Sequence, residues 1–138
     1  MGDAGEALPD GASLLSPWAD LVVQGETMKT RAKADPLVAQ EWLLACAAAY
    51  KGDTDPAIPG MSPVFGDFAG LPPLDIHVGD AEVLLGDSLA VAERARAAGV
   101  EVTLEVWPEM LHIWQVLWPA MPEGAAAVEK AAAFVKAE

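Results

Sequence analysis

Short apolar runs alternate with longer amphipathic segments along this chain. Three of the short runs predict β-strands, at about 12–16, 74–78 and 101–106. Apolar or β-branched stretches of this length, bounded by Gly, Pro or Ser, are typical of strands. Pro17 closes the first run, because proline has no N–H to donate to a sheet, and Gly79 closes the second. The pattern therefore predicts three strands.

Three longer segments predict α-helices, because their apolar residues recur at helical spacing. The first covers about 37–50, with Asp35 as its N-cap and Pro36 in its first turn. The second ends before Gly99, a typical C′ residue, and the third is the Ala-rich segment that closes the sequence. The positions assigned to the apolar faces are Trp42, Leu43, Cys46 and Tyr50 in the first helix, Leu85, Leu89 and Ala92 in the second, and Phe134 in the third.

The order of these elements favours the α/β class. Strands that alternate with helices form parallel sheets with right-handed crossover connections. A length of 138 residues suits one domain with a hydrophobic core. Residues 51–73, rich in Gly, Pro and Asp, predict a long connection between the first helix and the second strand.

Composition narrows the classes of partner and location. The net charge is −13, and Lys29, Arg31 and Lys33 are the only local group of cations, which argues against nucleic acid and anionic membrane surfaces. No apolar run approaches the roughly 18 residues of a membrane span, and the acidic first residues do not resemble a signal peptide. The single cysteine, Cys46, excludes a disulfide framework and favours a cytoplasmic location. We interpret it as a small buried hydrophobe.

Ionisable side chains follow two of the predicted strands, at the ends where parallel sheets collect functional groups. Asp80 and Glu82 follow the second strand, and His112 follows the third. If these strands are neighbours, about 4.8 Å apart, a carboxylate can reach the imidazole. Such a pair is the orienting half of a Ser-His-Asp triad. The alternative is that His112, within "PEMLHIWQVLWP", is a partly buried structural residue.

Other chemistries lack a sequence signal. His77 lies inside the second strand, and we expect it to face a helix or solvent. Two histidines 35 positions apart, without cysteines or carboxylates at ligand spacing, make no metal signature. The phosphate-binding patterns GxxxxGK and GxGxxG do not occur. The nucleophile elbow G-x-S-x-G is also absent, because "GASLL" and "GMSPV" lack the second glycine, and there is no HGG stretch for an oxyanion hole.

Long runs of this sequence resemble the C-terminal part of the bacterial hormone-sensitive-lipase-like esterases, a branch of the α/β-hydrolase fold. The runs are "LLSPWADL", "ETMKTRAKADP" and "SPVFGDFAGLPPLDIHVGDAEVLLGDSLAVAERARAAGVEVTLEVWPEMLHIW". The resemblance implies a carboxylic ester hydrolase without a cofactor, with its triad in the chain order serine, acid, histidine. It implies His112 as the catalytic histidine and Glu82 as the acid, where many members have aspartate. Asp80 is the fallback acid.

The same resemblance implies a partial α/β-hydrolase fold. The three strands correspond to the sixth to eighth strands of the family, with flanking helices and a cap-type helix. Residues 1–138 are expected to form a single truncated portion, with 24–60 as a cap-region insertion. The HGGG motif and the serine elbow of the family are missing, so we expect the chain alone to be inactive. We also expect a marginal or aggregating monomer unless a complementary fragment is supplied, because the first strand would have an unpaired edge.

The resemblance further implies a small ester with a short acyl chain as substrate. Trp18, Trp42 and Phe65 are candidates for the pocket lining, and the alternative is that they belong to the core. The expected partners are a second copy, through the last strand, or the missing N-terminal half. A second function stays open, namely a non-catalytic remnant or interaction domain that binds an apolar ligand or a complementary chain.

Overall fold

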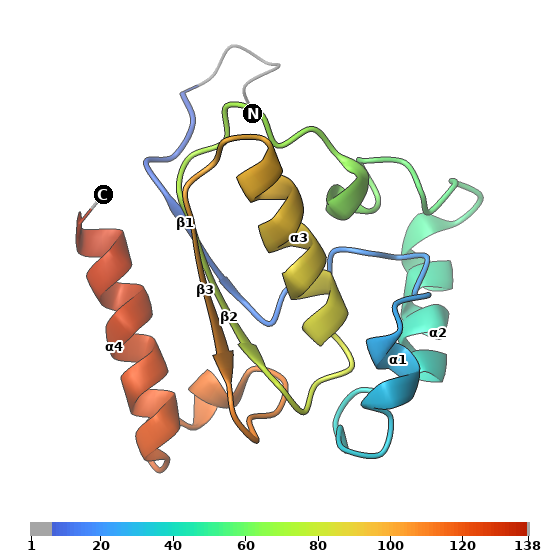
Figure 1. The fold of residues 1–138 in the computed structure, drawn as a ribbon. Helices are drawn as coiled ribbons and strands as arrows, with labels where there is room; N and C mark the ends of the chain where they lie inside the picture. Colours follow the sequence, from blue (N-terminus) through green and yellow to red (C-terminus); the bar gives the residue numbers. More distant parts are fainter. Residues whose placement is uncertain (1–6, 138) are drawn as a thin grey trace.

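The computed structural model describes residues 7–137, and its centre is a sheet of three parallel strands (Figure 1). The strands are β1 (Ala12–Leu15), β2 (Leu74–Gly79) and β3 (Val102–Trp107), in the spatial order β1-β2-β3. Their register aligns Leu14 with Ile76, and Ile76 with Leu104. The predicted strands and the α/β class are confirmed, and all three carboxyl ends lie at one edge of the sheet.

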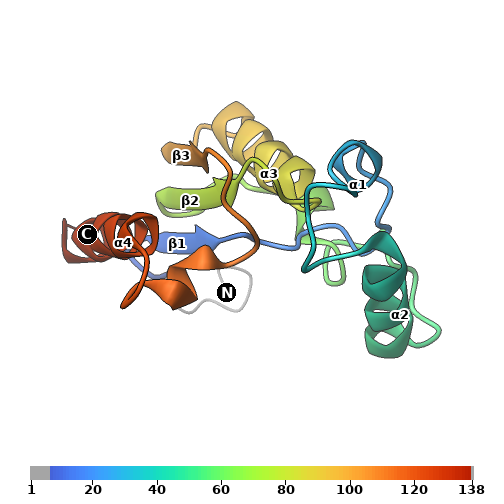
Figure 2. The same ribbon diagram turned by 90° about the horizontal axis from the view of Figure 1, so that it is seen from below.

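Helices cover both faces of this sheet. Figure 2 shows α3 on one face and α4 on the opposite face, with α1 and α2 beyond α3. Two short 3₁₀ helices, η2 and η3, lie in the connections. The bounds are α1 (Thr27–Thr30), α2 (Gln40–Lys51), η2 (Pro63–Phe65), α3 (Leu85–Ala97), η3 (Trp114–Leu117) and α4 (Pro122–Ala137).

The α3 face of the sheet is apolar. Side chains alternate between the two faces of a strand, so Leu74 and Ile76 share one face of β2. They pack with Val91, Ala92 and Ala95 of α3 in the largest buried cluster. Burial of this apolar surface is the main force that holds α3 on the sheet.

The α4 face of β2 carries a buried polar network instead. Ser13 Oγ and His77 Nε2 both donate to Asp75 Oδ2, each at 3.0 Å, and Trp107 Nε1 donates to His77 Nδ1 at 3.1 Å. Because Nδ1 accepts, Nε2 carries the ring proton. The sequence predicts that His77 faces a helix or solvent; it lies on the α4 face of the sheet and is fully buried, so the solvent alternative is excluded. Hydrogen bonds therefore tie all three strands together at this level.

The ends of two helices follow different rules. Gly99 adopts a φ of +83° directly after α3, as predicted, and the Val100 N–H reaches back to the Ala95 carbonyl. Helix α2 begins at Gln40 rather than at 37, and Ala39, not Asp35, is its N-cap. The Asp35 carboxylate instead accepts bonds from backbone N–H groups in the turn before the helix.

The predicted apolar face of α2 is also wrong in part. Leu43 and Ala47 are buried, whereas Trp42 and Tyr50 are 59% and 71% exposed. Cys46 is half-buried rather than buried. In the described part of α4, Phe134 is likewise half-buried. Through residues 7–137, no helix combines the length and the apolar character needed to cross a lipid bilayer.

Candidate catalytic site

The structure brings Glu82 and His112 into contact at the carboxyl edge of the sheet. Glu82 lies in the turn between β2 and α3, here called the acid turn. His112 lies in the loop between β3 and η3, here called the histidine loop. His112 Nδ1 and Glu82 Oε2 are 3.2 Å apart. Since a carboxylate only accepts, Nδ1 donates this bond, and in the neutral imidazole Nε2 is then the nitrogen with the free lone pair. The Glu82 side chain is fully buried, and the ring is 26% exposed.

The other carboxylate oxygen of Glu82 has two further donors. Oε1 accepts the Gly79 N–H at 2.6 Å and the Ser16 hydroxyl at 2.8 Å. Buried charge is tolerated only where hydrogen bonds or opposite charges replace water. Three donors around one carboxylate meet that requirement, and they fix the orientation of the acid against the ring.

Asp80, the fallback acid, braces the loop that carries the histidine. Its Oδ1 accepts the Glu109 N–H at 2.7 Å, and its own N–H donates to the Trp107 carbonyl at 2.9 Å. Glu109 has a φ of +59°, which non-glycine residues seldom adopt. The acid in contact with the ring is Glu82, whereas Asp80 bonds to the backbone N–H of Glu109, three positions before His112.

Gly79 leaves room for this loop. A Cβ at this position would overlap the carbonyl oxygen of Met110, which is a backbone atom and cannot swing aside. Glycine therefore lets the histidine loop lie directly on the end of β2. The same residue donates its N–H to Glu82. One position thus sets the distance between the two loops, and the sequence identified Gly79 only as the end of a strand.

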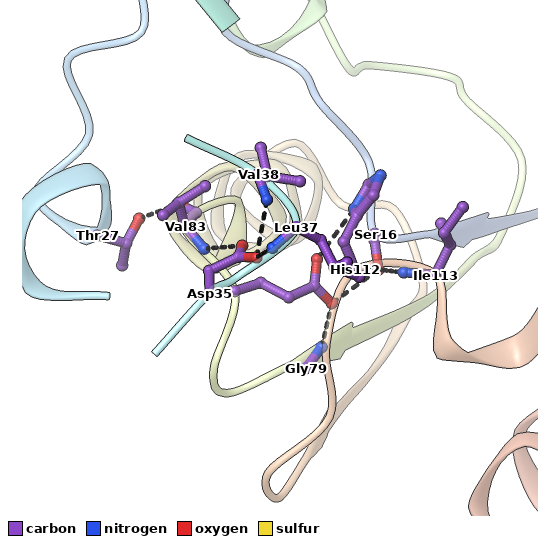
Figure 3. Close-up of polar contacts among 10 residues, drawn as sticks. Ser16, Thr27, Asp35, Leu37, Val38, Gly79, Val83, His112 and Ile113 are labelled. Carbon is purple, nitrogen blue, oxygen red and sulfur yellow. Dashed lines mark hydrogen bonds and ion pairs between the residues drawn. The ribbon is translucent and has the colours of Figure 1, made fainter. Parts of the chain in front are cut away.

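Ser16 is a site residue that sequence reasoning missed. It follows β1, and its hydroxyl lies between Glu82 and the backbone N–H of Ile113, which it accepts at 3.2 Å (Figure 3). The contacts span 66 and 97 positions of sequence. The sequence signals only that a strand ends at this serine, so its role could not be predicted.

A second set of contacts holds the residue next to Glu82. The Val83 carbonyl accepts the Thr27 hydroxyl at 2.6 Å, and the Val83 N–H donates to Asp35 Oδ2 at 3.0 Å (Figure 3). Thr27 and Asp35 both belong to the segment expected to form a cap region. Both backbone groups of Val83 are thereby bonded to this segment, which ties it to the acid turn.

A pocket of about 400 Å³ adjoins His112. Its lining is mostly apolar and includes Leu37, Leu111, Val116 and Met121. The predicted lining residues lie elsewhere. Trp18 lines a separate pocket of about 480 Å³ with Cys46 and Tyr50, whereas Trp42 and Phe65 are 59% and 42% exposed. The structure thus does not bring the three predicted aromatic residues together beside His112.

One titratable group near the end of β1 has a displaced pKa. Burial raises the pKa of Asp87 from 3.8 to about 6, although N–H donors from Ala19 and Asp20 act in the opposite direction. Asp87 lies in the first turn of α3 and binds the segment that follows Ser16.

Among the described residues, no group of three or more His, Cys, Asp or Glu side chains could hold a metal ion.

Comparison with known proteins decides the family. Residues 1–116 match the family model described as alpha/beta hydrolase fold. The chain belongs to the α/β-hydrolase fold family. The β1-β2-β3 sheet, with the acid turn after β2 and the histidine loop after β3, is therefore part of an α/β hydrolase.

Relatives of this α/β hydrolase are esterases. The acetyl-hydrolase of Streptomyces hygroscopicus is 46% identical over 134 residues, which are 97% of this chain and 45% of that protein. A crystal structure of an esterase from the bacterial hormone-sensitive lipase family is 43% identical, with a TM-score of 0.95, over 97% of this chain and 45% of that one. A structure of EstE5 soaked with p-nitrophenyl butyrate is 42% identical, with a TM-score of 0.93 and the same coverage. The chain thus spans less than half the length of these relatives.

Proposed function

We propose that His112 and Glu82 are the base and the acid of a serine-acid-histidine triad in a carboxylic ester hydrolase. The observation that carries the proposal is the 3.2 Å contact between His112 Nδ1 and a fully buried, three-fold hydrogen-bonded carboxylate. The pair joins two loops at the sheet edge where α/β proteins hold their reacting groups. The similarity to an acetyl-hydrolase and to an esterase supports the ester-hydrolase part of this proposal.

Each side chain has a definite part in this chemistry. Glu82 accepts the Nδ1 proton and so holds the tautomer whose Nε2 can take a proton from a serine hydroxyl. The serine oxygen then attacks the ester carbonyl, and the imidazolium returns the proton to the leaving alcohol. Water attacks the acyl-enzyme in the second half of the cycle, with His112 as base again. Glu82 stabilises the imidazolium in both halves.

We place the nucleophile outside these 138 residues, because the sequence contains no G-x-S-x-G elbow. Within the described residues, β1 pairs only with β2, so its other edge is available for a further parallel strand. Exposed apolar side chains next to the site would be covered by such a partner; they are Leu15, Ile113, Val116, Leu117 and Trp118. We infer that a serine-bearing α/β-hydrolase portion is the complement of this chain.

The proposed substrate is a small ester with a short acyl chain. It is supported by the similarity of this chain to an acetyl-hydrolase and to EstE5, whose crystal was soaked with p-nitrophenyl butyrate. We retain 24–60 as a cap region, because α1 and α2 lie beyond α3, outside the layers of the sheet (Figure 2).

Three earlier expectations stay as proposals. Trp18, Trp42 and Phe65 are proposed to line the acyl pocket. A cytoplasmic location and a homodimer through β3 remain predictions.

Complementation tests the proposal. The part of the Streptomyces acetyl-hydrolase that this chain does not cover would be co-expressed with the chain, and p-nitrophenyl butyrate hydrolysis measured for each part and for both. We expect turnover only with both parts, and its loss in His112→Ala, because the base is removed. A fast rate from this chain alone would show that it holds its own nucleophile. A stable, inactive complex would favour the interaction-domain alternative.

A further inference from the structure

One hydroxyl group connects the two halves of the Glu82 and His112 pair. Ser16 Oγ donates to Glu82 Oε1 at 2.8 Å and accepts the Ile113 N–H at 3.2 Å. Ile113 directly follows His112, so the hydroxyl bonds both to the side chain of the acid and to the peptide group that links His112 to Ile113. The Ser16 residue is only 2% exposed, which keeps water from replacing either bond.

The backbone at both ends of this bridge is strained. Ser16 has a φ of +47° although it precedes Pro17, and residues before proline normally adopt extended conformations with negative φ. Ile113 has a φ of +48°, which is rare for a β-branched residue. Such conformations cost free energy and persist where surrounding contacts hold them. At Ser16, those contacts include the Ser16 N–H, which donates to the His77 carbonyl at 2.8 Å.

We propose that Ser16 is a positioning residue whose hydroxyl sets the geometry between Glu82 and His112. The proposal rests on the function assigned above to that pair. By binding Oε1, the hydroxyl fixes the carboxylate rotation that aims Oε2 at the ring. By accepting the Ile113 N–H, it holds the loop that presents His112 Nδ1. Ser16 does not touch the reacting atoms, and acts only through these two residues.

A test uses the chain as it stands, with ¹⁵N NMR of its two imidazole rings and its backbone amides. The ring of His77 is fully buried and that of His112 is 26% exposed, so the two rings should give separate signals. We expect neutral His112 to carry its proton on Nδ1 in the native chain. In Ser16→Ala the Nδ1–H form should give way to a mixture of tautomers. Exchange of the Ile113 amide should become about tenfold faster, since one hydrogen bond of ordinary strength is lost.

A matched variant separates the hydroxyl from the backbone. Ser16→Gly also lacks the hydroxyl but adopts positive φ without strain, so it should fold even if the alanine variant does not. We expect it to lose the Nδ1–H preference as well. The control is Ser13→Ala, which removes a hydroxyl within β1 that bonds to Asp75, and it should leave both signals of the His112 loop unchanged.

The outcomes separate this inference from the proposed function. Native signals in both Ser16 variants, or native signals in Ser16→Gly alone, would overturn the role of the hydroxyl. An equal change in Ser13→Ala would mean general loosening and would also overturn it. If the native ring keeps its Nδ1–H form and both Ser16 variants lose it, but the complemented enzyme is inactive, the esterase proposal fails and the positioning role stands.

Discussion

The Glu82 carboxylate lies inside the protein with a complete set of hydrogen-bond donors, and that set controls what the residue can do. Its donors are the Gly79 N–H, the Ser16 hydroxyl and the His112 ring. Removing a single donor would leave a buried charged oxygen short of partners, at a cost of about 1–3 kcal/mol. The orientation of the acid is therefore set by its surroundings as much as by its own rotamer.

The raised pKa of Asp87 predicts that the stability of the folded chain depends on pH. Its pKa is raised from 3.8 to about 6, so the folded chain binds this proton more tightly than the unfolded chain does. The contribution of Asp87 to stability is therefore greatest below about pH 4 and declines as the pH rises to about 6. Asp87→Asn keeps an oxygen acceptor and cannot ionise.

We expect the stability of Asp87→Asn relative to the native chain to increase by about 1 kcal/mol between about pH 5 and about pH 7. Urea unfolding at the two pH values measures it. A difference that stays constant or shrinks with rising pH would contradict the raised pKa of Asp87 and the burial that causes it.

Only some residues of the site could be predicted from the sequence. His112 and Glu82 follow strands, and the position after a parallel strand carries information about function. Ser16 and Gly79 carry no such signal, because their roles depend on contacts with distant parts of the chain. The burial of His77 was equally hidden, since its partners Asp75 and Trp107 meet it only after the sheet has formed.

Helix α2 shows that tertiary contacts, and not periodicity alone, decide which face of a helix is buried. Trp42 and Leu43 are adjacent, and both suit an apolar face, yet Leu43 is 1% exposed and Trp42 is 59% exposed. Leu43 packs with Val23, Val38 and Val83 in a cluster beside the acid turn. Which side of α2 packs depends on the direction in which the turn at Asp35 places the helix against the rest of the chain. Periodicity alone does not specify that direction.

The adjacent pair gives a matched test of this packing. We expect Leu43→Ala to lower the free energy of unfolding by about 2–5 kcal/mol, because it leaves a cavity in a buried cluster. Trp42→Ala, the larger truncation, should change it by no more than about 0.5 kcal/mol, because most of the ring is already in water. Denaturant unfolding of both variants gives the comparison, and a larger loss for Trp42→Ala would mean that the other face of α2 is the packed one.

The order of strands and helices along the chain predicted the parallel sheet. Strands that alternate with helices are almost always joined by right-handed crossovers in a parallel sheet. The place of the 24–60 segment could not be predicted, since it depends on bonds from Thr27 and Asp35 to Val83. The neighbouring positions of β2 and β3 convert two separate loops into one site. The chain spans about 45% of the length of the Streptomyces acetyl-hydrolase and of the hormone-sensitive lipase family esterase.

If Glu82 orients His112 for ester hydrolysis, replacing Glu82 must cost far more activity than replacing its neighbour Asp80. In the complemented enzyme, kcat for p-nitrophenyl butyrate would be measured for Glu82→Gln and Asp80→Asn. Glu82→Gln should lower kcat by about 10³–10⁴-fold, because an amide can hold the ring in the wrong tautomer. Asp80→Asn keeps the acceptor for the Glu109 N–H and should cost less than about tenfold. Full activity in Glu82→Gln, or an equal loss in Asp80→Asn, would show that Glu82 is not the orienting acid.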